Sequence, residues 1–310
     1  MMKISLIDAQ TAIINYKDTF KSRSARHILE SLRGMKASAI ASNDKSKLRE
    51  VRGWICLLQA QEHYFSAFEK CLQREYYKAW CDLEVSITFI ERLPSSLDVK
   101  ILECIDFLKK KISKLQTLYP YKMFGSPEYI FKRKCTICDS YVNYRKKCEH
   151  LPGSIYDGKL CKYAMTDFEF LAMALVENPV QKYSVPFAKD EATGKHFDHY
   201  DYKLLDYLFS GIRNPFEHWD YEIQSKAVPT SKFKDLKDDV SCPCISDKKY
   251  GECCKGKEVI VIQNLEFVIS EFAARRIKSL GGKWRVKPPA RNIGREFHIA
   301  IFHTTHEDLS

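Results

Sequence analysis

The sequence predicts an α+β protein in which a helical N-terminal domain precedes two small cysteine-rich modules and a short C-terminal α/β segment. Apolar residues recur every three or four positions through the first 118 residues, which indicates helices. Eight of the twelve cysteines fall into two tight clusters in the second half of the chain. Apolar residues alternate with other residues near the C-terminus, which indicates strands. The predicted domains are 1–118, 119–230 and 231–310.

The composition excludes several classes of protein. With 310 residues, of which 45% are hydrophobic and 29% charged, the chain can bury a core and is not a disordered polypeptide. No apolar run approaches the ~18 residues that a membrane helix needs, so we expect no membrane partner. The N-terminal apolar patch is broken by Asp8 and lacks a secretory pattern, which predicts a cytoplasmic protein. In that compartment cysteines bind metal or stay as buried thiols rather than forming disulfides.

The N-terminal domain is predicted to be a helical bundle. One helical face combines Trp80, Leu83, Ile87 and Ile90, and a second runs from Leu97 to Leu115. Pro94-Ser95-Ser96 separates the two helices, and the stretch from Tyr64 to Leu93 has the pattern of a helical hairpin. We expect this domain to contact a protein partner.

The remaining elements are shorter. The apolar run from Phe168 to Val176 fits either a strand or a buried helix, and residues 186–199 are predicted to form a loop. Apolar positions between Tyr202 and Ile212 form a helical face. Residues 259–269 and 297–302 are predicted strands with a helix around 272–277 between them.

The first cysteine cluster has the spacing of a metal site. Two cysteines three residues apart are followed by a Cys-x-His pair, and the predicted ligands are Cys135, Cys138, Cys148 and His150. Tetrahedral Zn²⁺ takes four such sulfur or nitrogen ligands, supplied as two pairs that a short hairpin brings together. Cys161 is the alternative ligand, in place of either Cys148 or His150.

The second cluster has the same two-plus-two form, with Cys242, Cys244, Cys253 and Cys254 as predicted ligands. Four protein ligands close each shell and leave no position for a catalytic water, so we expect two structural Zn²⁺ sites that stabilise two small modules. The other four cysteines, Cys56, Cys71, Cys81 and Cys104, lie singly within helical patterns and are expected to be buried thiols.

The second cluster resembles a known zinc module. The residues Cys242-Pro243-Cys244, Ser246, Lys248-Lys249-Tyr250 and Cys253-Cys254 match the SEC-C motif, which usually has glycine at the positions of Ile245 and Asp247. The resemblance covers about thirteen residues and implies a zinc-held knob that docks on protein partners or the ribosome. SEC-C motifs recur as accessory knobs in bacterial defence and mobile-element proteins, and the resemblance implies a similar setting here.

Most of the net charge of +10 lies in one segment, residues 275–295. Basic residues interleaved with an aromatic ring suit a phosphate backbone and a stacked base, so this segment is the predicted nucleic-acid interface. Its members are Arg275, Arg276, Lys278, Lys283, Trp284, Arg285, Lys287, Arg291 and Arg295. A second basic cluster flanks the first metal ligands and contains Lys132, Arg133, Lys134, Arg145, Lys146 and Lys147. A solvated basic surface is the alternative for both.

Arg213 and His218 have the Arg-x4-His spacing of HEPN-domain ribonucleases, a resemblance that implies a catalytic pair. An imidazole would transfer protons and a cation would stabilise the charge that builds on the phosphate. Pro215 between them cannot lie inside a helix, so the alternative is a turn in which Arg213 pairs with Glu217 or Asp220.

The sequence therefore predicts a two-zinc binding or adaptor protein that engages nucleic acid. The alternatives are a metal-independent ribonuclease that uses Arg213 and His218, and an adaptor that binds only proteins.

Overall fold

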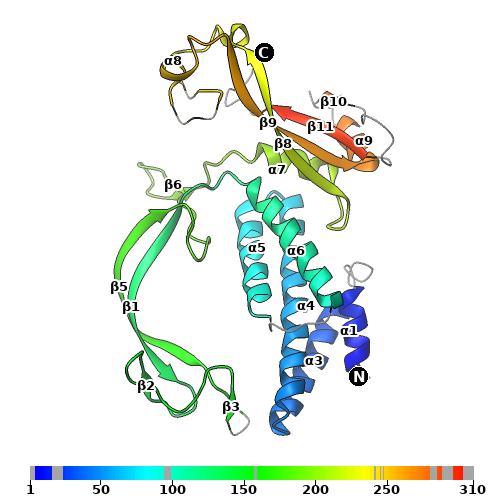
Figure 1. The fold of residues 1–310 in the computed structure, drawn as a ribbon, viewed down its shortest axis with the longest axis vertical. Coiled ribbons are helices and arrows are strands. Elements are labelled where there is room, and N and C mark those ends of the chain that lie inside the picture. The colour runs from blue at the N-terminus through cyan, green and yellow to red at the C-terminus, as the bar shows by residue number, and fades with distance from the viewer. Residues whose placement is uncertain are drawn as a thin grey trace. The chain divides into compact units, whose positions relative to one another are not determined.

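The mixed α+β fold is confirmed in a computed structural model of the chain (Figure 1). The structure describes residues 4–15, 24–93, 99–156, 159–240, 242–244, 246, 248–279, 285–287 and 296–302. The chain forms two compact units, residues 1–205 and 206–310. The division into domains at 118 and 230 stays a prediction.

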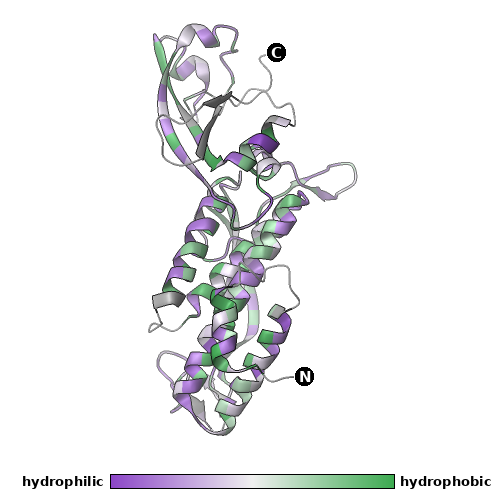
Figure 2. Cartoon of the chain, turned by 90° about the vertical axis from the view of Figure 1, so that its right-hand side faces the viewer, coloured by the Kyte–Doolittle hydropathy of each residue, from purple (hydrophilic) through white to green (hydrophobic). Residues whose placement is uncertain are grey.

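The first unit begins with helices. They are α1 (Leu6–Ile14), α3 (Ser24–Ala41), α4 (Lys45–Leu72), α5 (Tyr76–Glu91) and α6 (Val99–Thr117). The side chains of Ser5 and Asp44 accept hydrogen bonds from backbone amides in the first turns of α1 and α4, which fixes where these helices begin. Figure 2 shows hydrophobic and hydrophilic residues mixed along each helix, as expected of amphipathic helices that bury one face.

The predicted hairpin between Tyr64 and Leu93 is confirmed as the end of α4 and the whole of α5. Residues 73–75 form the turn, and Arg74 adopts φ of 60° there. The two helices pack closely. The buried hydroxyl of Ser86 on α5 reaches the backbone of α4 and donates a hydrogen bond to the Ala60 carbonyl oxygen at 2.7 Å. None of the described helices combines the length and the apolar character that crossing a membrane requires.

The rest of the first unit is built on a long two-stranded ribbon. Strand β1 (Phe124–Cys135) pairs antiparallel with β5 (Tyr163–Val176), and the short β2 (Tyr141–Val142) pairs antiparallel with the other edge of β1 near its end. The run from Phe168 to Val176 is thus a strand, and most of its side chains are exposed. Asp167 adopts φ of 53° at a register shift in this ribbon.

Two short strand pairs complete the described part of this unit. Strands β3 (Ile155–Tyr156) and β4 (Lys159–Leu160) form a small hairpin beside the first cysteine cluster. The predicted loop at 186–199 contains a second short hairpin, β6 (Ala188–Lys189) and β7 (His196–Phe197).

The second unit is an antiparallel sheet in the order β10-β11-β9-β8. Its strands are β8 (Trp219–Pro229), β9 (Val259–Ser270), β10 (Arg285–Lys287) and β11 (Glu296–Phe302). The two predicted C-terminal strands and the helix between them are confirmed, the helix being α9 (Glu271–Ser279). Helix α7 (Lys203–Gly211) packs against α9 so closely that a Cβ on Gly211 would lie 2.7 Å from Ile277.

Candidate metal centres

The first pair of predicted ligands lies where β1 ends. Cys135 is the last residue of β1, and its register partner on β5 is Tyr163. The chain then turns tightly, with the Asp139 amide donating to the Cys135 carbonyl oxygen at 2.9 Å and Asp139 at φ of 57°. The Ile137 amide points at the Cys135 sulfur at 3.5 Å. This turn holds the thiols of Cys135 and Cys138 on the same side.

A second turn supplies the other pair. The side-chain oxygen of Asn143 accepts hydrogen bonds from the amides of Arg145 and Lys146, and this orders the chain that leads into Cys148. The His150 ring packs edge-on against Tyr156 with centroids 4.5 Å apart. Its Nδ1 atom is buried and has no hydrogen-bond partner within the described structure. A buried imidazole nitrogen without a partner is costly, and a bound metal ion would satisfy it.

The four donors predicted from the sequence come together here. One ligand atom from each of Cys135, Cys138, Cys148 and His150 lies within 4.8 Å of all the others, so the cluster can hold a metal ion. Cys161 is close as well, because its sulfur is 3.8 Å from that of Cys135 and both side chains are fully buried. The first cluster therefore has four donors that are all close to one another and a fifth thiol beside one of them.

Two thiols of this cluster have a pKa below the usual value, that of Cys138 through hydrogen bonding with Ser140 and that of Cys135 through backbone amides. Burial raises the pKa of Cys135, but the backbone amides of Cys138 and Ile137 donate to its sulfur and bring the pKa down to about 7. Burial raises the pKa of Cys161 to about 11. The thiolate is the form that ligates metal, so at neutral pH Cys135 supplies it far more readily than Cys161 does.

The second cluster is built on a compact loop and the short helix α8 (Tyr250–Cys253). The Cys242 amide donates to the Lys248 carbonyl oxygen at 2.8 Å, and the Tyr250 amide donates to that of Val240 at 2.8 Å. The Cys254 amide donates to the Tyr250 carbonyl oxygen at 3.1 Å. These bonds bring the two cysteine pairs face to face.

The sulfur positions in this second cluster fit a tetrahedral metal ion. Sulfur atoms bound at about 2.3 Å to one Zn²⁺ would lie about 3.8 Å apart. The observed separations are 3.3 Å for Cys242–Cys244, 3.5 Å for Cys244–Cys253 and 3.7 Å for Cys253–Cys254. All four donor atoms lie within 4.8 Å of one another. The residues thus match a closed four-sulfur shell with little rearrangement.

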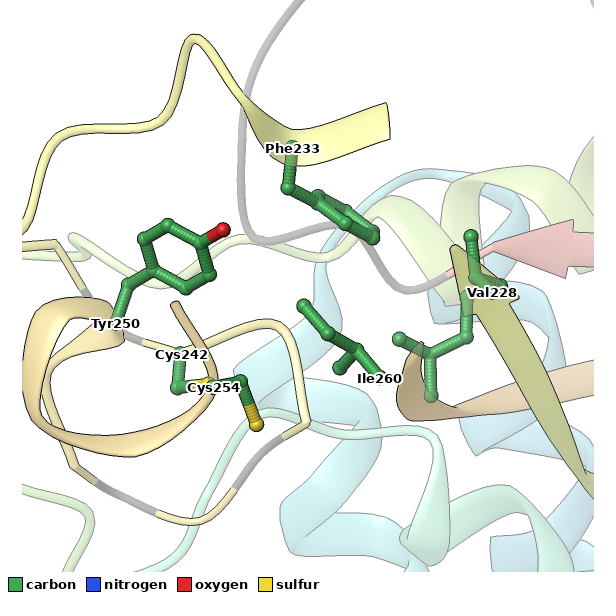
Figure 3. Close-up of a cluster of buried hydrophobic side chains, with 7 residues drawn as sticks. Val228, Phe233, Cys242, Tyr250, Cys254 and Ile260 are labelled. Atoms are coloured by element: carbon green, nitrogen blue, oxygen red, sulfur yellow. The ribbon is translucent and has the colours of Figure 1, made fainter. Parts of the chain in front are cut away.

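A small hydrophobic core anchors this second module to the sheet. Figure 3 shows the Cys242 and Cys254 side chains beside the Tyr250 ring, with Phe233, Ile260 and Val228 continuing the same cluster. Val228 lies on β8, Ile260 on β9 and Phe233 in the 3₁₀ helix Thr230–Phe233. Two of the four predicted sulfur ligands are therefore part of a packed core, which limits how far the cluster can distort.

The thiols of the second cluster differ in acidity. Burial raises the pKa of Cys242 to about 12. Burial also raises that of Cys244, but interactions with the Ser246 hydroxyl and the neighbouring thiols lower it to about 6. Ser246 belongs to the motif recognised in the sequence but is not among the predicted ligands, and its hydroxyl oxygen lies 3.1 Å from the Cys253 sulfur.

The predicted catalytic residues Arg213 and His218 do not share a helix. Helix α7 ends at Gly211 and β8 begins at Trp219, so both residues lie in the connection between them. The Arg213 guanidinium donates to the carbonyl oxygens of Phe209 and Ile212, and its backbone amide donates to the Glu217 carboxylate at 3.0 Å. These contacts give Arg213 the role of a C-terminal cap on α7. Catalysis by this pair stays a prediction.

The basic C-terminal segment is described only in part. Arg275 forms an ion pair with Glu271, and Arg276 forms one with Glu217. The side chains of Lys278, Lys283, Trp284, Arg285, Lys287, Arg291 and Arg295 lie outside the described structure. The two described cations of this segment are therefore already paired with carboxylates.

No protein-family model, curated protein or solved structure matches this chain. The SEC-C resemblance therefore rests on the cysteine-rich loop around Cys242 and Cys254 itself.

Proposed function

We propose that the protein is a zinc-stabilised binding protein in which two closed Zn²⁺ sites hold recognition modules in shape and the first module engages nucleic acid. One observation carries the proposal: the turn that delivers the ligand Cys148 also presents the exposed cations Arg145, Lys146 and Lys147. Metal binding and presentation of positive charge are thereby coupled in one short loop. Such a coupling suits a module that binds a polyanion.

Zn²⁺ is the metal that the donor sets favour. Thiolate and imidazole donors in closed four-ligand shells suit zinc rather than the hard cations Mg²⁺ and Ca²⁺, which take oxygen ligands. Cys135, Cys138, Cys148 and His150 would hold one ion, and Cys242, Cys244, Cys253 and Cys254 the other. The ions would supply folding energy to the two modules, because small modules of this kind gain much of their stability from metal binding.

The other parts of the chain complete the proposal. The basic C-terminal segment adds positive charge to the nucleic-acid contact, and the helices of the first unit contact a protein partner. The SEC-C resemblance makes the second module a docking knob, consistent with a cytoplasmic role in bacterial defence or a mobile element.

Two measurements on the purified full-length chain test the proposal. Elemental analysis is expected to give about two equivalents of zinc per chain, and fewer than one would overturn the metal sites. Hydrogen exchange after chelation is expected to show early loss of protection near residues 135–161 and 242–254, while the amides of α4 and α5 keep theirs.

A binding assay tests the nucleic-acid function. Retention of DNA or RNA is expected at low ionic strength and should fall steeply as salt is added, because contacts to phosphate release counterions. A protein that binds no nucleic acid at low salt would leave the adaptor that binds only proteins as the remaining function.

A further inference from the structure

Aromatic rings form a continuous row along one face of the β1–β5 ribbon. Phe170 contacts Tyr129 with ring centroids 5.7 Å apart, Tyr129 contacts Phe168 at 6.2 Å, and Phe168 contacts Phe131 at 6.1 Å. The Arg133 guanidinium continues the row, because it lies 5.6 Å from the centroid of Phe131 and 5.5 Å from that of Tyr144. We call this set the aromatic stripe: Phe170, Tyr129, Phe168, Phe131, Arg133 and Tyr144.

Four large rings of the stripe are exposed, while Phe131 and Arg133 between them are half-buried. Tyr144 is 85% exposed, Phe168 61%, Phe170 56% and Tyr129 45%. A two-stranded ribbon gains little stability from apolar side chains that remain in water. Exposed rings with free faces are the feature that proteins use to stack unpaired bases.

Positive charge is concentrated at the Tyr144 end of the stripe. The Arg133 guanidinium contacts the rings of Phe131 and Tyr144. Within the described structure, no carboxylate forms an ion pair with Arg133. The exposed Arg145, Lys146 and Lys147 follow Tyr144 directly in the chain. The neighbouring lysines of β1, unlike Arg133, form ion pairs with carboxylates. Lys134 pairs with Asp139 at 2.6 Å, and Lys132 pairs with Asp167 at 3.6 Å.

The carboxylates of the ribbon lie away from the stripe. Glu128 and Glu169 are direct chain neighbours of Tyr129 and of Phe168 and Phe170, so the alternation of side chains along a strand places them on the opposite face. Asp167 is held by Lys132 and by the Tyr141 hydroxyl, which donates to it at 3.1 Å. The face that carries the rings therefore joins aromatic surface to positive charge.

We propose that the aromatic stripe binds single-stranded nucleic acid, with bases stacked on Tyr129, Phe168 and Tyr144 and phosphates on Arg133 and the cations that follow Tyr144. A single strand fits because its bases are free to stack, whereas the bases of a duplex are already paired and stacked. This inference rests on the proposed nucleic-acid function and locates it on the first unit.

The test is fluorescence anisotropy of labelled single-stranded DNA, single-stranded RNA and a DNA duplex of mixed sequence, titrated with the zinc-loaded full chain at low ionic strength. Phe168→Ala and Tyr144→Ala are each expected to weaken single-strand binding at least about fivefold, and Tyr144→Phe should bind as the parent does. Arg133→Gln should reduce the slope of log affinity against log salt by about one.

Ile130→Ala is the matched control. Ile130 is 53% exposed and lies next to Tyr129 on the opposite face of β1, so this variant removes a similar apolar side chain without touching the stripe. Every variant is checked for two bound metal ions and an unchanged circular dichroism spectrum.

The outcomes separate the two proposals. Weaker binding by the ring variants with unchanged binding by Ile130→Ala supports the stripe. If the chain binds single strands but the ring variants bind as the parent does, the stripe is wrong and the nucleic-acid function stands. Tighter binding to the duplex than to either single strand also overturns the stripe. Absence of any binding at low salt overturns both.

Discussion

The sulfur atoms of Cys135 and Cys161 lie 3.8 Å apart, and both side chains are fully buried. Cys135 ends β1, and Cys161 precedes β5, where its amide donates to the Ser154 carbonyl oxygen at 2.8 Å. The separation equals the edge of about 3.8 Å expected for two sulfurs on one tetrahedral Zn²⁺. Cys161 could therefore share a metal ion with Cys135, although the donors that all lie within 4.8 Å of one another are Cys135, Cys138, Cys148 and His150.

We expect His150 to be the fourth ligand and Cys161 to support the shell from outside it. The buried Nδ1 of His150 needs a partner, whereas the Cys161 thiol already has the Cys135 sulfur as a neighbour. Cobalt-substituted protein should then show the absorption of three sulfurs and one nitrogen at the first site. His150→Ala should change that spectrum, while Cys161→Ser should keep it and weaken metal binding by about 10–100-fold.

The reverse pattern would identify Cys161 as the ligand. In that case Cys161→Ser would lose sulfur-to-cobalt charge-transfer intensity, and His150→Ala would leave the spectrum as it was. Cys71→Ser is a suitable control, because Cys71 is buried in α4 and belongs to neither cluster.

Gly251 allows a sharp test of the second module. A Cβ at this position would lie 2.8 Å from Asp238 Cβ and 3.2 Å from the Asp238 carbonyl oxygen, which accepts a hydrogen bond from the Gly251 amide at 3.0 Å. Gly251→Ala must therefore displace the backbone at Asp238. We expect a loss of about 1–3 kcal/mol in the stability of the module, as in other overpacked sites, and release of the second metal at a lower chelator concentration.

Gly256→Ala provides the matched comparison, because a Cβ there meets no heavy atom within 4 Å. It should retain both metals as tightly as the parent protein. Equal metal retention by the two alanine variants would contradict the close approach of α8 to Asp238.

The local features of this chain could be predicted from the sequence, and the long-range ones could not. Helical periodicity predicted the α4–α5 hairpin, and ligand spacing predicted which donors meet, because both depend on residues near one another in the chain. The approach of Cys161 to Cys135 depends on how β1 pairs with β5. The apolar content of Phe168–Val176 suggested a strand or a buried helix. It could not reveal that Leu175 is 63% exposed, because the burial of a side chain depends on which other parts of the chain pack over it.

Asp82 links α5 to α4 and should make the first unit sensitive to acid. Its carboxylate lies 3.1 Å from His63 Nδ1 and 2.5 Å from Lys70 Nζ. Burial alone would raise the pKa of Asp82, but the hydrogen bonds from His63, Lys70 and Ser66 lower it to about 2. The pKa of Asp82 is lower in the folded protein than in the unfolded chain. The contribution of Asp82 to the free energy of unfolding is therefore complete above pH ~4 and is lost as the pH falls toward 2.

Asp82→Asn is accordingly expected to cost about 2 kcal/mol of unfolding free energy at pH 7 and much less near pH 2. Urea denaturation of the two proteins at both pH values measures this. Glu75→Gln is the control, because the Lys78–Glu75 pair is far more exposed and such surface pairs contribute little. A difference between Asp82→Asn and the parent that stays constant with pH would contradict the assigned pKa.

The turn from Arg213 to His218 decides the ribonuclease alternative. Cleavage of RNA by this pair needs a guanidinium whose donors face a phosphate, but Arg213 donates to two carbonyl oxygens at the end of α7. We therefore expect Arg213→Ala to lower the stability of the second unit by about 1–2 kcal/mol, as loss of charged hydrogen bonds does. His218→Ala should leave the rate of RNA degradation by the purified protein unchanged. If the parent protein degrades RNA and His218→Ala does not, while the thermal midpoint of the variant equals that of the parent, the protein is instead a ribonuclease that uses His218.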